Sequence, residues 1–190
     1  MSQMNKPDPS SAVAKSFLSD VKAVRERARQ NLDEGAITPN YGIEAKAVCE
    51  ALNSALASEL VCVLRYKRHY YMAEGINADP VKAEFLEHAK QEQGHADQLA
   101  GRICQLGGAP DLNPEGLAAR AHTEYVAGST LREMIKEDLV AERVGIESYR
   151  EMINWIGDRD TTTRAMLEGI LAVEEEHAAD MSSLLQGLRD

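Results

Sequence analysis

Two segments of the chain repeat the pattern Glu-x-x-His, at Glu92–His95 and at Glu174–His177. In a helix, residues three apart lie on one face and about 4.5 Å apart along the axis. The carboxylate and the imidazole of each pair can therefore reach one metal ion. A single pair of this kind is commonly a solvated pair on a helix surface, so the pattern needs support from other residues.

Two further glutamates, Glu59 and Glu142, interrupt apolar helix stripes where a leucine is expected. An ionised carboxylate in a dry core is costly unless it is paired or binds a metal. Counted from turn centres near Asn77 and Asp158, all four glutamates lie 15 to 18 residues away. At about 1.5 Å per residue they fall at one level of a helical bundle, roughly 25 Å from the turns.

Four carboxylates and two imidazoles at one level can hold two divalent metal ions. The expected roles are terminal ligands for Glu59 and Glu142, bridges for Glu92 and Glu174, and one cap on each ion for His95 and His177. These ligands suit iron, with manganese as the alternative, and the lack of thiolates argues against structural zinc. We expect two iron ions per chain.

Four long amphipathic helices must position this ring. We expect them at residues 43–73, 79–106, 130–156 and 160–188, with a cap at Asp79-Pro80 and a capping box from Thr130 to Glu133. The glycines and prolines of residues 107–129 predict a long crossover with a short helical turn near 116–125. The fold class is an all-α four-helix bundle with one long crossover, the ferritin-like connectivity.

The N-terminal part has a different pattern. Residues 1–10 are polar and predict a loose arm, and an apolar stripe from Phe17 to Leu32 predicts an amphipathic helix over 11–34. We therefore divide the chain into an arm with an extra helix, residues 1–40, and the bundle, residues 41–190.

The 190-residue chain has 44% hydrophobic and 27% charged residues, with a formal charge of −10. This composition predicts a soluble globular domain. No apolar run approaches the roughly 18 residues of a membrane span, and the N-terminus lacks the apolar segment of a signal peptide. The negative charge argues against a surface built for nucleic acid. Three cysteines without a CxxC pair suit a reducing cytoplasm, where we expect the protein.

Several segments resemble the bacterioferritin branch of the ferritin-like family. They are Ser58-Glu59-Leu60, Gly108–Leu112, Asp138–Gly145 and Glu174–His177, and the resemblance covers about residues 45–188. It implies a ferroxidase that binds Fe(II), oxidises it with O2 or H2O2 and holds ferric iron inside a hollow shell. It also implies that Tyr66, seven residues after Glu59, donates an electron to the site, with an ordinary core tyrosine as the alternative.

Three features depart from that branch. Gln93 stands where bacterioferritins carry the methionine that binds haem, so we expect no haem. The sequence runs 13 residues past His177, too short for the fifth helix typical of 24-subunit shells, and it has an N-terminal extension of about 40 residues. The last two features resemble Dps-like proteins, which build 12-subunit shells. We expect a homo-oligomeric shell of 12 rather than 24 subunits, with the site inside each chain.

Other functions fit the same residues. A di-manganese catalase or a rubrerythrin-like peroxidase would use the same ligands, and a Dps-like protein would protect DNA, which the net charge disfavours. His88, one turn before Glu92, either supports a ligand from outside the ring or acts as an entry ligand, or is simply a packed histidine. Cys62, three residues from Glu59, is either redox-active or a small buried filler.

Overall fold

The computed structural model describes residues 20–188, and the chain divides after Asn40 into two units. In the first unit, helix α2 spans Val21–Arg27 and a 3-10 turn spans Leu32–Glu34. No residue of α2 is buried. The separate roles assigned to residues 1–40 and 41–190 stay a prediction.

The expectation of one continuous helix up to residue 34 is wrong. Asp20 caps the start of α2, because its carboxylate accepts hydrogen bonds from the backbone N–H groups of Lys22 and Ala23 at 2.9 and 3.1 Å. The helix ends at Arg27, and Asn31 has a left-handed φ of 49°, which a right-handed helix cannot contain. Phe17 and residues 1–10 lie outside the described residues.

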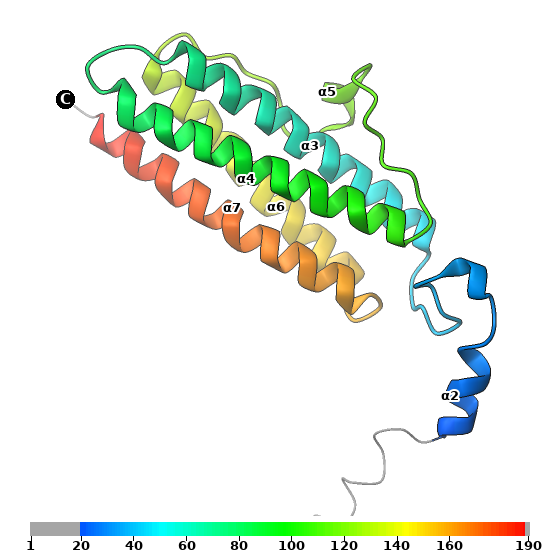
Figure 1. Ribbon diagram of the computed structural model, residues 1–190. Helices are drawn as coiled ribbons and strands as arrows, with labels where there is room; N and C mark the ends of the chain where they lie inside the picture. Colours follow the sequence, from blue (N-terminus) through cyan, green and yellow to red (C-terminus); the bar gives the residue numbers. More distant parts are fainter. Residues whose placement is uncertain (1–19, 189–190) are drawn as a thin grey trace, which may run out of the picture. The chain divides into compact units, whose positions relative to one another are not determined.

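The second unit is a bundle of four long antiparallel helices (Figure 1). They are α3 (Ala45–Met72), α4 (Ala78–Gln105), α6 (Leu131–Ile156) and α7 (Thr161–Gly187). The hairpin of α3 and α4 packs against the hairpin of α6 and α7, and the crossover between them carries the short helix α5 (Leu117–Arg120) beside α3. No strand occurs in residues 20–188. This architecture confirms the predicted all-α bundle with one long crossover.

The apolar stripe of each long helix faces the others, as the periodicity predicted. Fully buried side chains come from all four helices and include Leu52, Leu56, Phe85, Leu99, Ile103, Ile135, Leu167 and Ile170. Burial of each such side chain contributes about 1.5–3 kcal/mol to the free energy of unfolding. The core therefore supplies a rigid frame on both sides of the glutamates.

Two helix starts differ in detail from the prediction. Helix α4 begins at Ala78 after Asn77, so Pro80 lies inside the first turn, where no intrahelical N–H bond is lost. At α6, the Thr130 hydroxyl accepts a hydrogen bond from the Glu133 N–H at 3.1 Å, as expected. The Glu133 carboxylate, however, accepts from the backbone N–H of Ser129 at 2.9 Å, one residue earlier than in a capping box.

A buried charged network anchors the end of the crossover to the bundle. Asp138 of α6 accepts a hydrogen bond from Arg65 Nε at 2.8 Å, and its other oxygen lies 2.8 Å from His69 Nδ1. Arg65 also donates to the carbonyl of Glu124 at 3.0 Å, and His69 Nε2 lies 3.0 Å from the carbonyl of Ala127. The network therefore fixes residues 124–127 against α3 and α6.

A second buried ion pair joins α4 to the start of α7. Arg102 donates to both carboxylate oxygens of Asp160 at 3.0 Å and to the Thr163 hydroxyl at 2.8 Å. Asp160 is also the N-cap of α7, and it accepts a hydrogen bond from the Tyr41 hydroxyl at 2.5 Å. This contact sets the position of α7 along α4, on which the level of Glu174 depends.

Helix α3 is long and apolar enough to span a membrane by length and composition, contrary to the expectation that no segment is. Within its most apolar window, 61% of the helix is buried inside the bundle. Core helices of soluble proteins pass the same test, so the finding is weak support for a membrane span.

Candidate metal centre

The structure brings all six predicted ligands together at one level of the bundle. Glu59 comes from α3, Glu142 from α6, the Glu92–His95 pair from α4 and the Glu174–His177 pair from α7. Their exposed fractions lie between 1% and 5%. Four carboxylates buried side by side have no purely structural explanation, because each one costs desolvation energy and repels the others.

The ligating atoms form two overlapping groups, each within 4.8 Å. One group contains Glu59, Glu92, His95 and Glu174, and the other contains Glu92, Glu142, Glu174 and His177. Nδ1 of His95 lies 2.8 Å from Glu174 Oε1 and 3.4 Å from Glu92 Oε2. Nδ1 of His177 lies 3.5 Å from Glu92 Oε1 and 3.7 Å from Glu174 Oε2. Each histidine therefore faces one side of the same pair of carboxylates.

Several buried ligating atoms have no hydrogen-bond partner in the described residues. They are one oxygen each of Glu59, Glu92 and Glu174, and Nδ1 of both His95 and His177. Leaving a buried polar atom unsatisfied costs about 1–3 kcal/mol, and more for a charged group. All of these atoms belong to residues of the two ligand groups, so a cation bound by those groups would satisfy them together.

The crowded charges shift the pKa values of the ring in opposite directions. Burial, together with the charges of Glu59 and Glu142, raises the pKa of Glu174 to about 7. Burial and the charge of Glu174 also raise the pKa of Glu92. Although burial acts to raise it, close contacts with His177 and Glu174 lower the pKa of Glu142 to about 2. The ring thus holds protons as well as negative charge.

Burial acts to lower the pKa of both histidines, but close contacts with the surrounding carboxylates outweigh it. Contacts with Glu174, Glu59 and Glu92 raise the pKa of His95 to about 12, and contacts with Glu142, Glu174 and Glu92 raise that of His177 to about 12. A proton on each ring then serves as the local positive charge. A bound metal ion would replace these protons, because metal ligands must be deprotonated.

Two tyrosines support the glutamates that are not shared between the groups. The Tyr66 hydroxyl donates a hydrogen bond to Glu142, and the Tyr149 hydroxyl donates one to Glu59. Tyr66 lies seven residues after Glu59, and Tyr149 lies seven residues after Glu142. The sequence interpretation identified Tyr66 and missed Tyr149, although the repeated spacing of seven residues was available to find it.

Two residues of α4 contact His177. Oε1 of Gln91 lies 2.7 Å from Nε2 of His177, so that nitrogen donates its hydrogen and Nδ1 faces the ring. The ring of His88 stacks on that of His177, with centroids 3.9 Å apart. His88 is 2% exposed, and burial together with the charge of His177 lowers its pKa to about 4.

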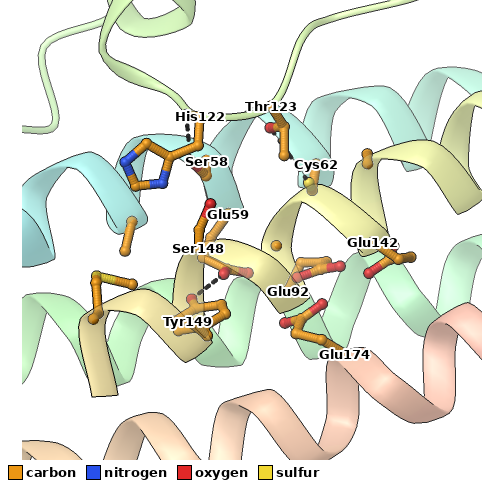
Figure 2. Close-up of a pocket in the computed structure, with 14 residues that line it drawn as sticks. Ser58, Glu59, Cys62, Glu92, His122, Thr123, Glu142, Ser148, Tyr149 and Glu174 are labelled. Carbon is orange, nitrogen blue, oxygen red and sulfur yellow. Dashed lines mark hydrogen bonds between the residues drawn. The ribbon is translucent and has the colours of Figure 1, made fainter. Parts of the chain in front are cut away.

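A small cavity borders the ring on the side of the crossover. Figure 2 shows Ser58, Cys62 and Tyr149 around it, with His122 and Thr123 of the crossover at its outer side. The backbone N–H of His122 donates to the Ser58 hydroxyl at 2.8 Å, and Cys62 Sγ lies 3.8 Å from the Thr123 hydroxyl. Burial raises the pKa of the Cys62 thiol, which therefore remains protonated and unreactive.

Gln93, which stands at the haem-ligand position, is exposed. Its side-chain amide donates a hydrogen bond to Asp97 at 3.0 Å on the same helix. It points away from the ring and contributes nothing to it.

The family model of the ferritin-like domain matches residues 49–190. The chain is 32% identical over 158 residues to a nutrient stress-induced DNA-binding protein of Synechococcus sp., covering 78% of this chain and 89% of that one. It is 29% identical over 131 residues to a bacterioferritin of Rhodobacter capsulatus, covering 68% and 77%.

Among solved structures, the bacterioferritin-related protein of Bacteroides fragilis, described as a dodecameric thioferritin, superposes with a TM-score of 0.75 at 31% identity. The superposition covers 77% of this chain and 89% of that one. The region that the family model matches contains α3 from residue 49 onward, the other three long helices and all six ring residues. With the family model spanning most of its length, the chain belongs to the ferritin-like family.

Proposed function

We propose that this protein is a ferroxidase that binds two iron ions per chain, oxidises Fe(II) with O2 or H2O2, and holds the ferric product inside a homo-oligomeric shell. The observation that carries the proposal is the set of buried oxygen and nitrogen atoms of the ring residues that have no hydrogen-bond partner. Carboxylate and imidazole ligands without thiolate suit iron and manganese. The bacterioferritin relatives favour iron.

The residues of the ring have distinct roles in this proposal. Glu92 and Glu174, shared by both ligand groups, would hold both ions, and Glu59 and Glu142, held by the tyrosine hydroxyls, would each hold one. His95 and His177 would each bind one ion through Nδ1. Bound ferrous ions would supply the electrons that reduce the oxidant. Tyr66 contacts a terminal ligand directly and is the proposed donor of a further electron.

Metal content and turnover test this function together. The purified chain should bind about two iron ions in competition with manganese, and it should oxidise Fe(II) under air or on addition of peroxide. Elemental analysis after loading, followed by absorbance of the ferric product, measures both. Manganese bound at two ions per chain with rapid release of O2 from peroxide would instead establish the catalase alternative.

The proposed shell contains 12 subunits. The dodecameric relative from Bacteroides fragilis shares 31% identity with this chain over most of its length. Twelve copies of the 20.9 kDa chain have a native mass of about 250 kDa, which light scattering or native mass spectrometry measures. A stable monomer, or a mass twice that of the 12-subunit shell, would rule out this assembly.

DNA protection is the second candidate, and the names of two relatives favour it. One is the DNA-binding protein of Synechococcus sp., and the other is a DNA protection during starvation protein of Pyrococcus furiosus, 29% identical over 150 residues. The net charge of −10 opposes binding to phosphates. A gel shift at physiological salt decides between direct DNA binding and protection through iron chemistry alone.

A further inference from the structure

The two histidines of the centre differ in the contacts that hold them. Nε2 of His177 lies 2.7 Å from Oε1 of Gln91, a half-buried side chain of α4. In residues 20–188, the close polar contacts of His95 are made through Nδ1, to carboxylates of the ring, and Nε2 has no hydrogen-bond partner. Within this part of the chain, His177 therefore has a hydrogen bond from outside the ring that His95 lacks.

This difference follows from one position at which the two hairpins differ. Gln91 directly precedes Glu92, and the residue directly before Glu174 is Val173. The valine side chain has no hydrogen-bonding group, so it cannot support a histidine in the same way. Because one hairpin does without an amide at this position, a two-metal centre does not itself require one.

The hydrogen bond of Gln91 favours the form of His177 that can bind a metal. An imidazole that binds a metal through Nδ1 carries its hydrogen on Nε2, and an amide oxygen beside Nε2 accepts that hydrogen. Such a contact fixes the orientation of the imidazole and makes the other nitrogen a stronger electron-pair donor. The bond is part-buried, so water competes with it less than at an exposed site.

We propose that Gln91 is a positioning residue that makes the two metal positions unequal, so that the first divalent cation binds beside His177 and the second beside His95. This inference rests on the proposed two-metal function. The favoured position belongs to the ligand group that contains Glu142, whose carboxylate accepts the hydrogen bond of Tyr66. The cation that binds first would therefore be the one next to the proposed electron donor.

Anomalous diffraction from crystals of the whole chain, soaked in less Co(II) than one ion per chain, tests the order of filling. The peak beside His177 should be several-fold stronger than the peak beside His95. Gln91→Leu removes the hydrogen bond at similar side-chain size and should make the two peaks similar in height. Gln91→Glu should restore the difference, because a carboxylate also accepts the hydrogen of Nε2. Gln98→Leu, at an exposed glutamine of the same helix, is the matched control and should behave as the wild type.

A Co(II) titration followed by visible absorbance measures the two binding steps in solution. In the wild type, the first step should be about tenfold tighter than the second, or more. Gln91→Leu should weaken binding beside His177 about 10–100-fold and leave binding beside His95 within about threefold, which removes the wild-type order. Circular dichroism should show the same helical content in all of these variants.

Wild-type order and affinities in Gln91→Leu would overturn the role of Gln91 alone. Equal weakening of both steps would also overturn it, because a general loss of structure affects both positions. The same holds if Gln91→Glu fails to restore the order, or if cobalt fills the position beside His95 first in the wild type. Absence of cobalt from both positions in the wild type would instead overturn the proposed two-metal function.

Discussion

Glu92 and Glu174 are the two residues that belong to both ligand groups of the centre. They come from α4 and α7, the second helix of each hairpin, and are 1% and 3% exposed. Burial and the charges of neighbouring glutamates raise the pKa of both carboxyls. Without a cation, two buried carboxylates in this environment are unfavourable. Binding of cations between them would remove this cost, as expected of ligands shared by two ions.

Replacing Glu174 by alanine should remove one of the two proposed bridging ligands. We expect Fe(II) oxidation to fall about 100-fold or more, with unchanged helical content by circular dichroism. The metal-free variant should also melt at a higher temperature than the wild type, because a repelled buried charge is gone. Glu176→Ala, an exposed change on the same helix, is the control; iron oxidation near the wild-type rate in Glu174→Ala would refute the assignment of the centre.

The raised pKa of Glu174 predicts a pH dependence of stability in the metal-free protein. Its pKa is about 7 in the folded chain against 4.5 unfolded, so between these values the folded state binds more protons. The free energy of unfolding that it contributes therefore falls as pH rises through this window. The melting temperature of wild type relative to Glu174→Gln should drop between pH 5 and pH 8. A difference that stays constant with pH would contradict the shift.

Tyr66 and Tyr149 provide a matched pair for separating electron donation from hydrogen bonding. Each donates to one terminal glutamate, so Tyr66→Phe and Tyr149→Phe should each lower the free energy of unfolding by about 1.5–3 kcal/mol. Tyr66→Phe should slow iron oxidation more than Tyr149→Phe does. Only Tyr66→Phe should abolish a tyrosyl radical signal in electron paramagnetic resonance. Equal kinetics in the two variants would assign both residues to ligand positioning.

The contact between Arg102 and Asp160 should matter for stability and not for the choice of metal. Asp160→Ala leaves a buried guanidinium unpaired and removes the N-cap of α7, so we expect a loss of about 3–5 kcal/mol in chemical denaturation. Arg164→Ala, which breaks an exposed pair with Asp158, should cost less than about 1 kcal/mol. Similar losses in both variants would show that the buried ion pair contributes no more to the free energy of unfolding than the exposed pair does.

We predict that the protein carries no stoichiometric haem. Gln93 is exposed, bonded to Asp97, and offers no thioether sulfur. Reconstitution with haemin followed by gel filtration should leave no Soret band with the protein peak. Haem at one per two subunits would show that another residue binds the iron.

The sequence predicted the ring because its determinants are short-range. The spacing of three in Glu174–His177 and the lengths of the hairpins both follow from helix geometry. Contacts between distant segments were harder to predict. The spacing of seven residues after Glu142 singles out Tyr149, but no local pattern names Glu59 as its partner or pairs Arg102 with Asp160. The break after Arg27 was missed because the apolar stripe continues past it, while Asn31 adopts a backbone conformation that an apolar stripe does not reveal.

The two tyrosine contacts have a consequence for how such a chain arises. Each hairpin carries a glutamate, a tyrosine seven residues later and a Glu-x-x-His pair, and each tyrosine reaches the other hairpin. Two copies of one hairpin, related by a twofold axis, would therefore contain every part of the centre. Joining the two hairpins by the crossover makes their association intramolecular and therefore independent of protein concentration. Once joined, the two hairpins can diverge. One such difference is His88, four residues before Glu92, where the other hairpin has Ile170 four residues before Glu174.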